Sequence, residues 1–172
     1  MPNFETERTI LRPVNVKDAA DLKELFDSPD VTAYLRYDAY AGLAEAEQAI
    51  NDHFSDEKYV FGIEEKKSGK LIGFFEFHPE DKGAILTYAL NQSYWGQGLM
   101  PEVGEVMVDY GFNQLGFDEF FAHYLRGLND KSGRVMEKLG MHDDGEIQHV
   151  SQYGKEFSLG QYSLTKDEYL KR

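Results

Sequence analysis

Residues 94–102, TyrTrpGlyGlnGlyLeuMetProGlu, have the composition of an anion-binding turn. Gly96 and Gly98 stand just before a helix that we expect to begin at Pro101, because proline is tolerated in the first turn of a helix. Glycines let backbone N–H groups point inward, and the helix N-terminus adds a positive dipole, so the segment suits a pyrophosphate. A tight turn that uses glycine for its backbone angles explains the same spacing. The segment contains no Lys-Ser or Lys-Thr pair after its glycines, so a nucleotide P-loop is not indicated.

A second segment with possible chemistry is AsnAspLysSerGlyArgValMetGluLysLeuGlyMet, residues 129–141. Asn129 offers both a donor and an acceptor to an amide-containing ligand, and Ser132 offers a hydroxyl one helical turn later. Alternatively, Asn129 or Asp130 caps the helix and Ser132 lies exposed in its first turn. This segment alone leaves both interpretations open.

The elements that must position these segments follow from hydrophobic periodicity and turn residues. The predicted order is strand, two helices, three strands, helix, strand, helix and two strands. The strands are expected at residues 9–14, 59–63, 71–77, 84–90, 119–125, 148–152 and 157–164. Helices are expected to start at 17, 42 and 101, and a short helix that carries Val135, Met136 and Leu139 is stopped by Gly140. There is no internal repeat and no Ser/Gly-rich linker, so residues 1–172 are predicted to form one mixed α/β domain.

Composition narrows the classes of function. Hydrophobic residues make up 41% of the 172 residues, which excludes a disordered chain. A net charge of −13 makes nucleic acid a poor partner and favours a cationic one. The absence of cysteine excludes disulfides, thiolate zinc sites and a cysteine nucleophile. With no signal-peptide core and no apolar run long enough for a membrane span, we expect a cytoplasmic protein that does not bind membranes. Its oligomeric state is expected to be a monomer or a homodimer.

The two segments, their order and the strand pattern together resemble the GNAT superfamily of N-acetyltransferases. The family's acetyl-CoA signature falls here on Trp95, Gly98 and Met100, and tryptophan in the first place is usual for the branch that acetylates the N-termini of ribosomal proteins. ThrGluArgThrIleLeuArgProVal, IleGlyPhePheGluPhe and GlnTyrSerLeuThrLysAspGluTyr also resemble that branch, so the resemblance covers nearly the whole chain. It implies a mixed, mostly antiparallel sheet of about six to seven strands flanked by about four helices.

The resemblance also implies direct transfer of acetyl from acetyl-CoA to a primary amine in a ternary complex, without a metal or a covalent enzyme intermediate. By this analogy Asn129 bonds the pantetheine arm, while Ala89 and Leu90 present backbone groups to it. Arg134 is a candidate partner of the CoA phosphates, as are the neighbouring Lys131 and Lys138. The backbone amides expected to hold the pyrophosphate are those of Gln97, Gly98, Leu99 and Met100.

The chemistry requires an amine of pKa near 10 to lose a proton and a thiolate of pKa near 8.5 to gain one. By the same resemblance, many members carry a Tyr acid where this chain has Met136, and this branch suggests Ser132 for that role. The Ser132 hydroxyl could donate a proton, donate a hydrogen bond to the sulfur or only cap the helix. The branch often has a Glu base where this chain has Ile85. The alternatives are Glu76 and His78, two apart on one strand face, although both could instead line its solvent side. A water relay to bulk solvent would need neither Glu76 nor His78 as the base.

Acceptor recognition is less defined. Residues 34–40, TyrLeuArgTyrAspAlaTyr, would lie beside the acceptor by analogy, where tyrosine rings and Asp38 could hold a cationic amine, or they could form a flap that closes the core. Candidate acceptors are a protein N-terminus, a polyamine and an amino sugar. The alternative function is a catalytically inactive module that binds CoA or acetyl-CoA. A purely structural protein would leave the turn at 95–100 without a use.

Overall fold

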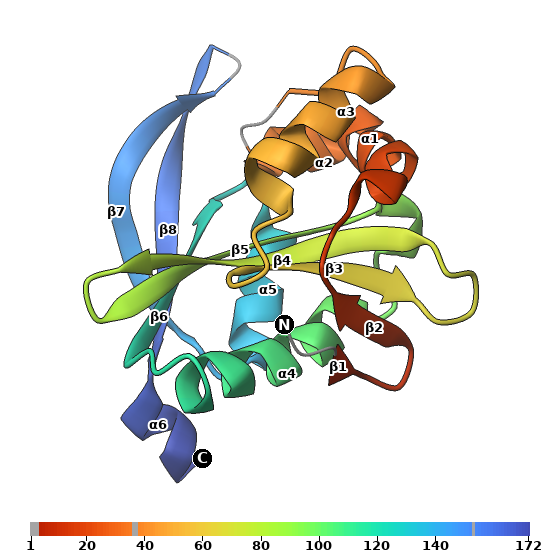
Figure 1. Ribbon diagram of the computed structural model, residues 1–172. Coiled ribbons are helices and arrows are strands. Elements are labelled where there is room, and N and C mark those ends of the chain that lie inside the picture. The colour runs from red at the N-terminus through yellow and green to blue at the C-terminus, as the bar shows by residue number, and fades with distance from the viewer. Residues whose placement is uncertain (1–3, 36–37, 153) are drawn as a thin grey trace. The chain divides into compact units, whose positions relative to one another are not determined.

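The computed structural model describes residues 4–35, 38–152 and 154–172. Within these residues the chain forms eight strands and six α-helices (Figure 1). The strands are β1 (Phe4–Glu5), β2 (Thr9–Arg12), β3 (Val60–Glu65), β4 (Leu71–Glu80), β5 (Gly83–Leu90), β6 (Glu119–Leu125), β7 (His142–Gln152) and β8 (Lys155–Thr165). The helices are α1 (Ala19–Asp27), α2 (Pro29–Leu35), α3 (Leu43–Ala49), α4 (Leu99–Asn113), α5 (Asp130–Lys138) and α6 (Lys166–Lys171), with short helical turns η1 (Val16–Asp18), η2 (Ile50–Phe54) and η3 (Gln92–Tyr94). The predicted mixed α/β class is confirmed, with slightly more strands and helices than expected.

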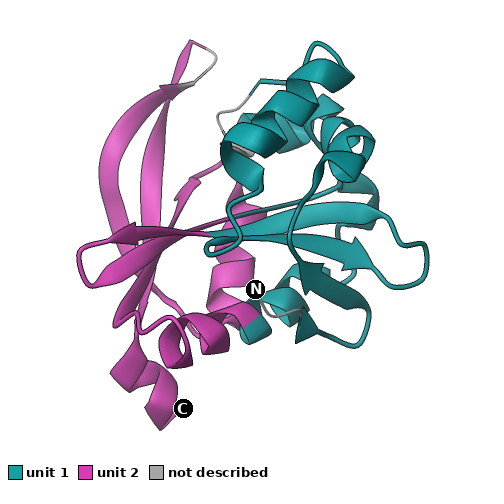
Figure 2. Ribbon diagram, viewed as in Figure 1, with its two compact units in different colours: residues 1–76, 88–106 teal, residues 77–87, 107–172 magenta. Residues whose placement is uncertain are grey.

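The chain divides into two compact units (Figure 2). Unit 1 comprises residues 1–76 and 88–106, and unit 2 comprises residues 77–87 and 107–172, so β4 and β5 contribute to both. The strand order is β1-β2-β3-β4-β5 in unit 1 and β4-β5-β6-β8-β7 in unit 2. The pairs β1-β2, β2-β3, β3-β4, β6-β8 and β7-β8 are antiparallel, whereas β5 and β6 are parallel.

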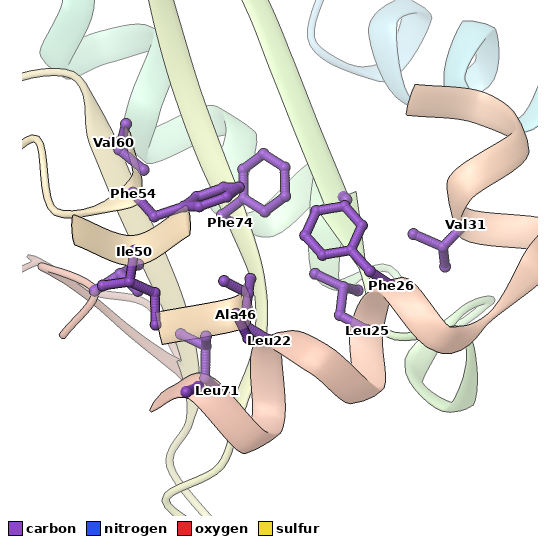
Figure 3. Close-up of a cluster of buried hydrophobic side chains, with 13 residues drawn as sticks. Leu22, Leu25, Phe26, Val31, Ala46, Ile50, Phe54, Val60, Leu71 and Phe74 are labelled. Atoms are coloured by element: carbon purple, nitrogen blue, oxygen red, sulfur yellow. The ribbon is translucent and has the colours of Figure 1, made fainter. Parts of the chain in front are cut away.

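The core of unit 1 forms where α1, α2, α3 and η2 pack on one face of β3 and β4 (Figure 3). Phe26 of α1, Phe54 of η2 and Phe74 of β4 are all buried. The ring centroids of Phe54 and Phe74 lie 5.1 Å apart in an edge-to-face arrangement. Such aromatic side chains bury large apolar areas, so this contact fixes η2 against β4.

The register of β3 and β4 decides which side chains face these helices. Val60 pairs with Glu76 and Gly62 pairs with Phe74. Residues two apart on a strand share a face, so Glu76 lies on the same face as Phe74, toward α1, α3 and η2. An acidic residue is therefore held at the edge of an apolar core.

The starts of α2 and α4 show how proline shapes the helices of this chain. Ser28 and Pro29 end α1 as expected, but Pro29 also begins α2, because its missing N–H and fixed φ suit the first helical position. Helix α4 begins at Leu99 instead of Pro101, since the backbone N–H of Glu102 donates to the carbonyl oxygen of Gly98. The proline still falls within the first turn, where it costs no helical hydrogen bond.

In unit 2, α5 packs on β6 and β8 through a glycine. A Cβ atom built on Gly133 would lie 3.5 Å from the Tyr124 ring and 3.6 Å from the Tyr162 ring, so the helix approaches both strands closely. A second aromatic group joins α4 to β6, where the rings of Phe112 and Phe120 are 4.3 Å apart. The last hairpin, β7 and β8, is longer than predicted because β-bulges let its strands continue through Gly145. In the part of the chain that the structure describes, no helix has the length and apolarity to cross a membrane.

Candidate active site

The turn predicted to bind an anion follows the end of β5. Asn91 begins η3, and its side-chain oxygen accepts from the backbone N–H of Ser93 at 3.0 Å. The indole Nε1 of Trp95 donates to the carbonyl oxygen of Leu90 at 2.7 Å. The turn is thereby folded back against the strand that precedes it.

The backbone of this turn is exposed to solvent at both glycines. Gly96 and Gly98 each have φ of +76°, a conformation that favours glycine. A Cβ atom on Gly96 would meet no other atom within 4 Å, and one on Gly98 would meet only Nη2 of Arg8 at 3.8 Å. The first N–H groups of a helix have no intrahelical acceptor. Exposed glycine backbone next to the start of α4 therefore has the features of an anion-binding turn.

The four residues expected to supply amides divide into two pairs. Gln97 and Gly98 are exposed, whereas the side chains of Leu99 and Met100 are buried in the core. The buried pair anchors the first turn of α4, and the exposed pair presents the backbone. The structure thus brings Gln97, Gly98, Leu99 and Met100 together with Leu90 in unit 1.

Ala89 and Leu90, the expected contacts of the pantetheine arm, are both buried at the end of β5. Here β4 approaches β5 closely, because a Cβ atom on Gly73 would lie 2.2 Å from the Ala89 carbonyl oxygen. The Leu90 carbonyl already accepts the Trp95 indole N–H, and a carbonyl oxygen has two lone pairs. One lone pair of Leu90 therefore holds the turn.

An arginine that the sequence analysis did not single out also contacts this turn. Arg8, between β1 and β2, donates from Nη1 to the carbonyl oxygen of Gln97 at 2.9 Å. Its Nε donates to Oε1 of Glu102, in the first turn of α4, at 3.0 Å. A contact across 89 or more residues leaves no local pattern, so only the fold reveals it.

Glu76, a candidate general base, has a histidine partner that the sequence analysis also missed. Its side chain is 3% exposed, and its Oε1 lies 2.5 Å from Nε2 of His53, whose side chain is 43% exposed. His53 belongs to η2, a π-helical turn, and such turns occur often at functional sites. The pair connects a buried carboxylate to a group that reaches solvent. The interpretation of Glu76 as a solvent-lining residue is wrong, because the residue faces the core.

His78, the other candidate base, lies in unit 2 and is half-buried. It precedes Pro79 and Glu80, which are exposed at the end of β4. Although His78 and Glu76 share a strand face, their environments differ. Ile85, at the position where related enzymes often carry Glu, is half-buried on β5.

Unit 2 carries Asn129, Ser132 and Arg134. Asn129 is buried at the N-cap position of α5, yet its side chain makes no capping hydrogen bond. The interpretation of Asn129 as a side-chain cap is therefore wrong. Asp130 instead accepts from the backbone N–H of Gly127 at 3.0 Å. The Asn129 amide is thus not used to begin the helix that follows it.

The remaining predicted residues of α5 differ in exposure. The alternative interpretation placed Ser132 exposed in the first turn of the helix. Ser132 is instead half-buried. Arg134 is exposed, as are Lys131 and Lys138. Met136, where many relatives carry the tyrosine acid, is buried.

Tyr162 is a nearby tyrosine in unit 2 but is poorly suited to donate a proton. Its hydroxyl donates to Oε1 of Glu137 at 2.6 Å. Burial raises the pKa of Tyr162, and the hydrogen bond to Glu137 and that residue's charge raise it further. Its phenol therefore stays protonated and does not replace Ser132 as the candidate acid.

The aromatic segment at residues 34–40 is described in part. Arg36 and Tyr37 lie outside the described residues, and Asp38 is exposed. Tyr40 packs edge-on against Phe26, with ring centroids 5.2 Å apart. This contact supports the interpretation of Tyr40 as part of a flap over the core of unit 1.

Comparison with known proteins agrees with the resemblance found in the sequence. The family model described as acetyltransferase (GNAT) domain matches residues 8–142. The uncharacterized N-acetyltransferase YoaA of Bacillus subtilis (strain 168) is 28% identical over 173 residues, which cover 96% of this chain and 97% of that protein.

Solved structures share the fold at lower identity. The ribosomal-protein-S5-alanine acetyltransferase from Vibrio fischeri superposes with a TM-score of 0.84 at 20% identity, covering 98% of this chain and 99% of that one. The spermidine N-acetyltransferase from Vibrio cholerae, solved with CoA and spermine, gives a TM-score of 0.81 at 20% identity and covers 95% of this chain and 98% of that one.

Proposed function

The chain belongs to the acetyltransferase (GNAT) domain family, and we propose that it transfers the acetyl group of acetyl-CoA directly to a primary amine within a ternary complex. The observation that carries this proposal is the turn after β5, where Gly96 and Gly98 expose backbone beside the start of α4. A helix N-terminus with accessible N–H groups favours a phosphate anion. In this proposal the amides of residues 97–100 bind the pyrophosphate of acetyl-CoA.

Asn129 is proposed to bind the pantetheine arm. Asn129 is a buried residue, and its side chain makes no capping bond to α5. A buried polar group is stable only when it is hydrogen-bonded, and an amide ligand offers both a donor and an acceptor. Ala89 and Leu90 would contribute backbone groups to the same arm, and Arg134 would interact with the CoA phosphates.

The reaction forms a C–N bond and breaks the C–S bond of the thioester, so one proton must leave the amine and one must reach the thiolate. We assign proton removal to Glu76 acting with His53, because the 2.5 Å contact connects a buried carboxylate to solvent. His78 is the alternative base. Ser132 is proposed to donate a hydrogen bond or a proton to the leaving sulfur.

The proposed acceptor is a cationic amine, such as a polyamine, a protein N-terminus or an amino sugar. The net charge of −13 attracts cations to the protein and accelerates their encounter with it. Two proteins with the same fold are named for spermidine and for the alanine of ribosomal protein S5, so the fold accommodates both kinds of acceptor.

Two measurements test the proposal. Isothermal titration with acetyl-CoA should give a Kd in the micromolar range, about 8 kcal/mol of binding free energy, and Asn129→Ala should weaken it. Thiol release is then followed with spermidine, a peptide with a free N-terminus and glucosamine. Binding without turnover of any amine would favour the inactive CoA-binding module. Absence of binding by the folded protein would refute the proposal.

A further inference from the structure

We propose that Arg8 is a positioning residue for the turn at residues 95–98, where it fixes the orientation of the amide between Gln97 and Gly98. The inference rests on the proposed function, because it assumes that this turn binds the pyrophosphate. Its basis is that one guanidinium contacts both the turn and the helix that follows it.

The first step concerns the peptide group that Arg8 contacts. Nη1 of Arg8 donates to the carbonyl oxygen of Gln97 at 2.9 Å. In a trans peptide the C=O and the next N–H point in opposite directions. The N–H of Gly98 is therefore turned to the side opposite Arg8. Since φ of Gly98 is +76° and glycine is conformationally permissive, this amide needs an external contact to hold one orientation.

The second step concerns the charge beside the proposed anion site. Glu102 lies in the first turn of α4, where its carboxylate would repel a bound pyrophosphate. That carboxylate accepts from Thr6 Oγ1 at 2.5 Å, from the Arg8 backbone N–H at 3.2 Å and from Arg8 Nε at 3.0 Å. The pairing neutralises Glu102 and keeps its oxygens turned toward the segment between β1 and β2.

The third step concerns the rigidity of Arg8 itself. Its carbonyl oxygen accepts from the backbone N–H of Lys66 at 3.0 Å, while its own N–H donates to Glu102. Both backbone groups are thus fixed, although the side chain is 42% exposed. A guanidinium with a fork of donors can contact Gln97 and Glu102 at once, which a lysine ammonium does less well.

The test compares acetyl-CoA with S-acetylpantetheine, which lacks the pyrophosphate. We expect Arg8→Gln to raise the Kd of acetyl-CoA about tenfold, because an ordered donor and a neutralising charge are lost together. Binding of S-acetylpantetheine should change less than about twofold. Arg8→Lys, which keeps the charge, should show an intermediate loss, and it remains informative if Arg8→Gln is poorly folded.

A charge-neutralising second substitution separates positioning from a general effect on folding. In Arg8→Gln/Glu102→Gln the repelling carboxylate is gone, so part of the lost acetyl-CoA affinity should return. Lys66→Gln is the matched control. Lys66 pairs with Glu5 at 3.2 Å, so this substitution also removes one positive charge from the same region. Its Kd should equal that of the wild type.

The possible outcomes separate failure of the Arg8 role from failure of the proposed function. If the wild type binds acetyl-CoA but Arg8→Gln binds it equally well, the role of Arg8 is refuted and the proposed function stands. An equal loss for S-acetylpantetheine, or no recovery in the double variant, also refutes it. If the wild type itself fails to bind acetyl-CoA, the proposed function is refuted and the role of Arg8 with it.

Discussion

The indole Nε1 of Trp95 donates to the carbonyl oxygen of Leu90 across 2.7 Å, so the turn after β5 closes on the end of its own strand. Trp95 also packs against the buried cluster of unit 1, which restricts the indole ring. A hydrogen bond from a ring held by packing keeps its geometry when a ligand arrives. The turn at residues 95–98 is therefore preformed at its first residue by Trp95 and near its last by Arg8.

Trp95→Phe should weaken acetyl-CoA binding. The substitution removes the indole donor while keeping an aromatic ring, so the expected loss is about 1 kcal/mol, or about fivefold in Kd. Titration calorimetry measures the change. Tyr94→Phe is the matched control, because the hydroxyl contact that it removes, to Glu65, is long at 3.4 Å. Equal Kd values for Trp95→Phe and the wild type would mean that the indole bond does not hold the turn.

Gly73→Ala should destabilise unit 1. The new Cβ would lie 2.2 Å from the Ala89 carbonyl oxygen and 3.2 Å from the Leu90 Cα, both backbone atoms that cannot rotate away. We expect a loss of about 2–4 kcal/mol in the free energy of unfolding, measured in urea. Gly42→Ala is the control, because a Cβ there meets no atom within 4 Å and its φ of −170° suits any residue. Similar urea midpoints for the two variants would contradict the close approach of β4 to β5.

Glu76→Gln should lower kcat with little change in the KM for acetyl-CoA. If Glu76 with His53 removes the amine proton, the loss is about 10²-fold or more, the usual contribution of general base catalysis. Turnover is measured with the best amine from the acceptor panel. His53→Gln tests the partner and should lower kcat less, since the carboxylate remains. His78→Gln serves as the comparison, and a larger effect there would transfer the base role to His78.

The free energy contributed by Glu102 should depend on pH. Burial raises its pKa, but the hydrogen bonds from Thr6 and Arg8 and the Arg8 charge outweigh burial and hold the pKa below the ordinary 4.5. The contribution is thus complete above pH 4.5 and is lost as pH falls through the lower pKa of the folded state. Surface pairs contribute up to about 1 kcal/mol, so the difference is modest.

The measurement for Glu102 is the urea midpoint of Glu102→Gln and the wild type at several pH values. The variant should be less stable at neutral pH, and the difference should disappear in acid. Glu105→Gln, on the same helix but exposed, controls for the loss of one carboxylate. A difference that is constant with pH would exclude ionisation of Glu102 as its cause.

The elements around the site could largely be predicted from local sequence. Strand β6 spans residues 119–125 as expected, because its apolar residues alternate and turn residues bound it. The glycines at 96 and 98 indicated the turn by their backbone requirements alone. Helix α2 was missed because Pro29 is equally suited to end one helix and to begin the next.

The side-chain partners of the site could not be predicted in the same way. His53 and Glu76 are 23 residues apart and meet only because η2 packs on β4 through Phe54 and Phe74. Arg8 reaches Gln97 because β1 and β2 place their turn near the start of α4. These contacts depend on tertiary packing, and residue spacing carries no trace of it. The sequence alone could not decide the cap role of Asn129, because the local motif fits both a helix cap and a ligand-binding residue.

Asn129→Ala should separate ligand binding from helix stability. Replacing a side chain that caps a helix costs about 1 kcal/mol, but the Asn129 side chain makes no such bond, so the thermal midpoint should change little. The Kd of acetyl-CoA should rise about tenfold, because a buried amide that pairs with the pantetheine arm is lost. Asp130→Ala is the matched control on the next residue, since it removes the bond from Gly127 and should lower stability without changing the Kd. If Asn129→Ala loses stability and keeps its affinity, the residue serves the fold and the pantetheine arm is held by other groups.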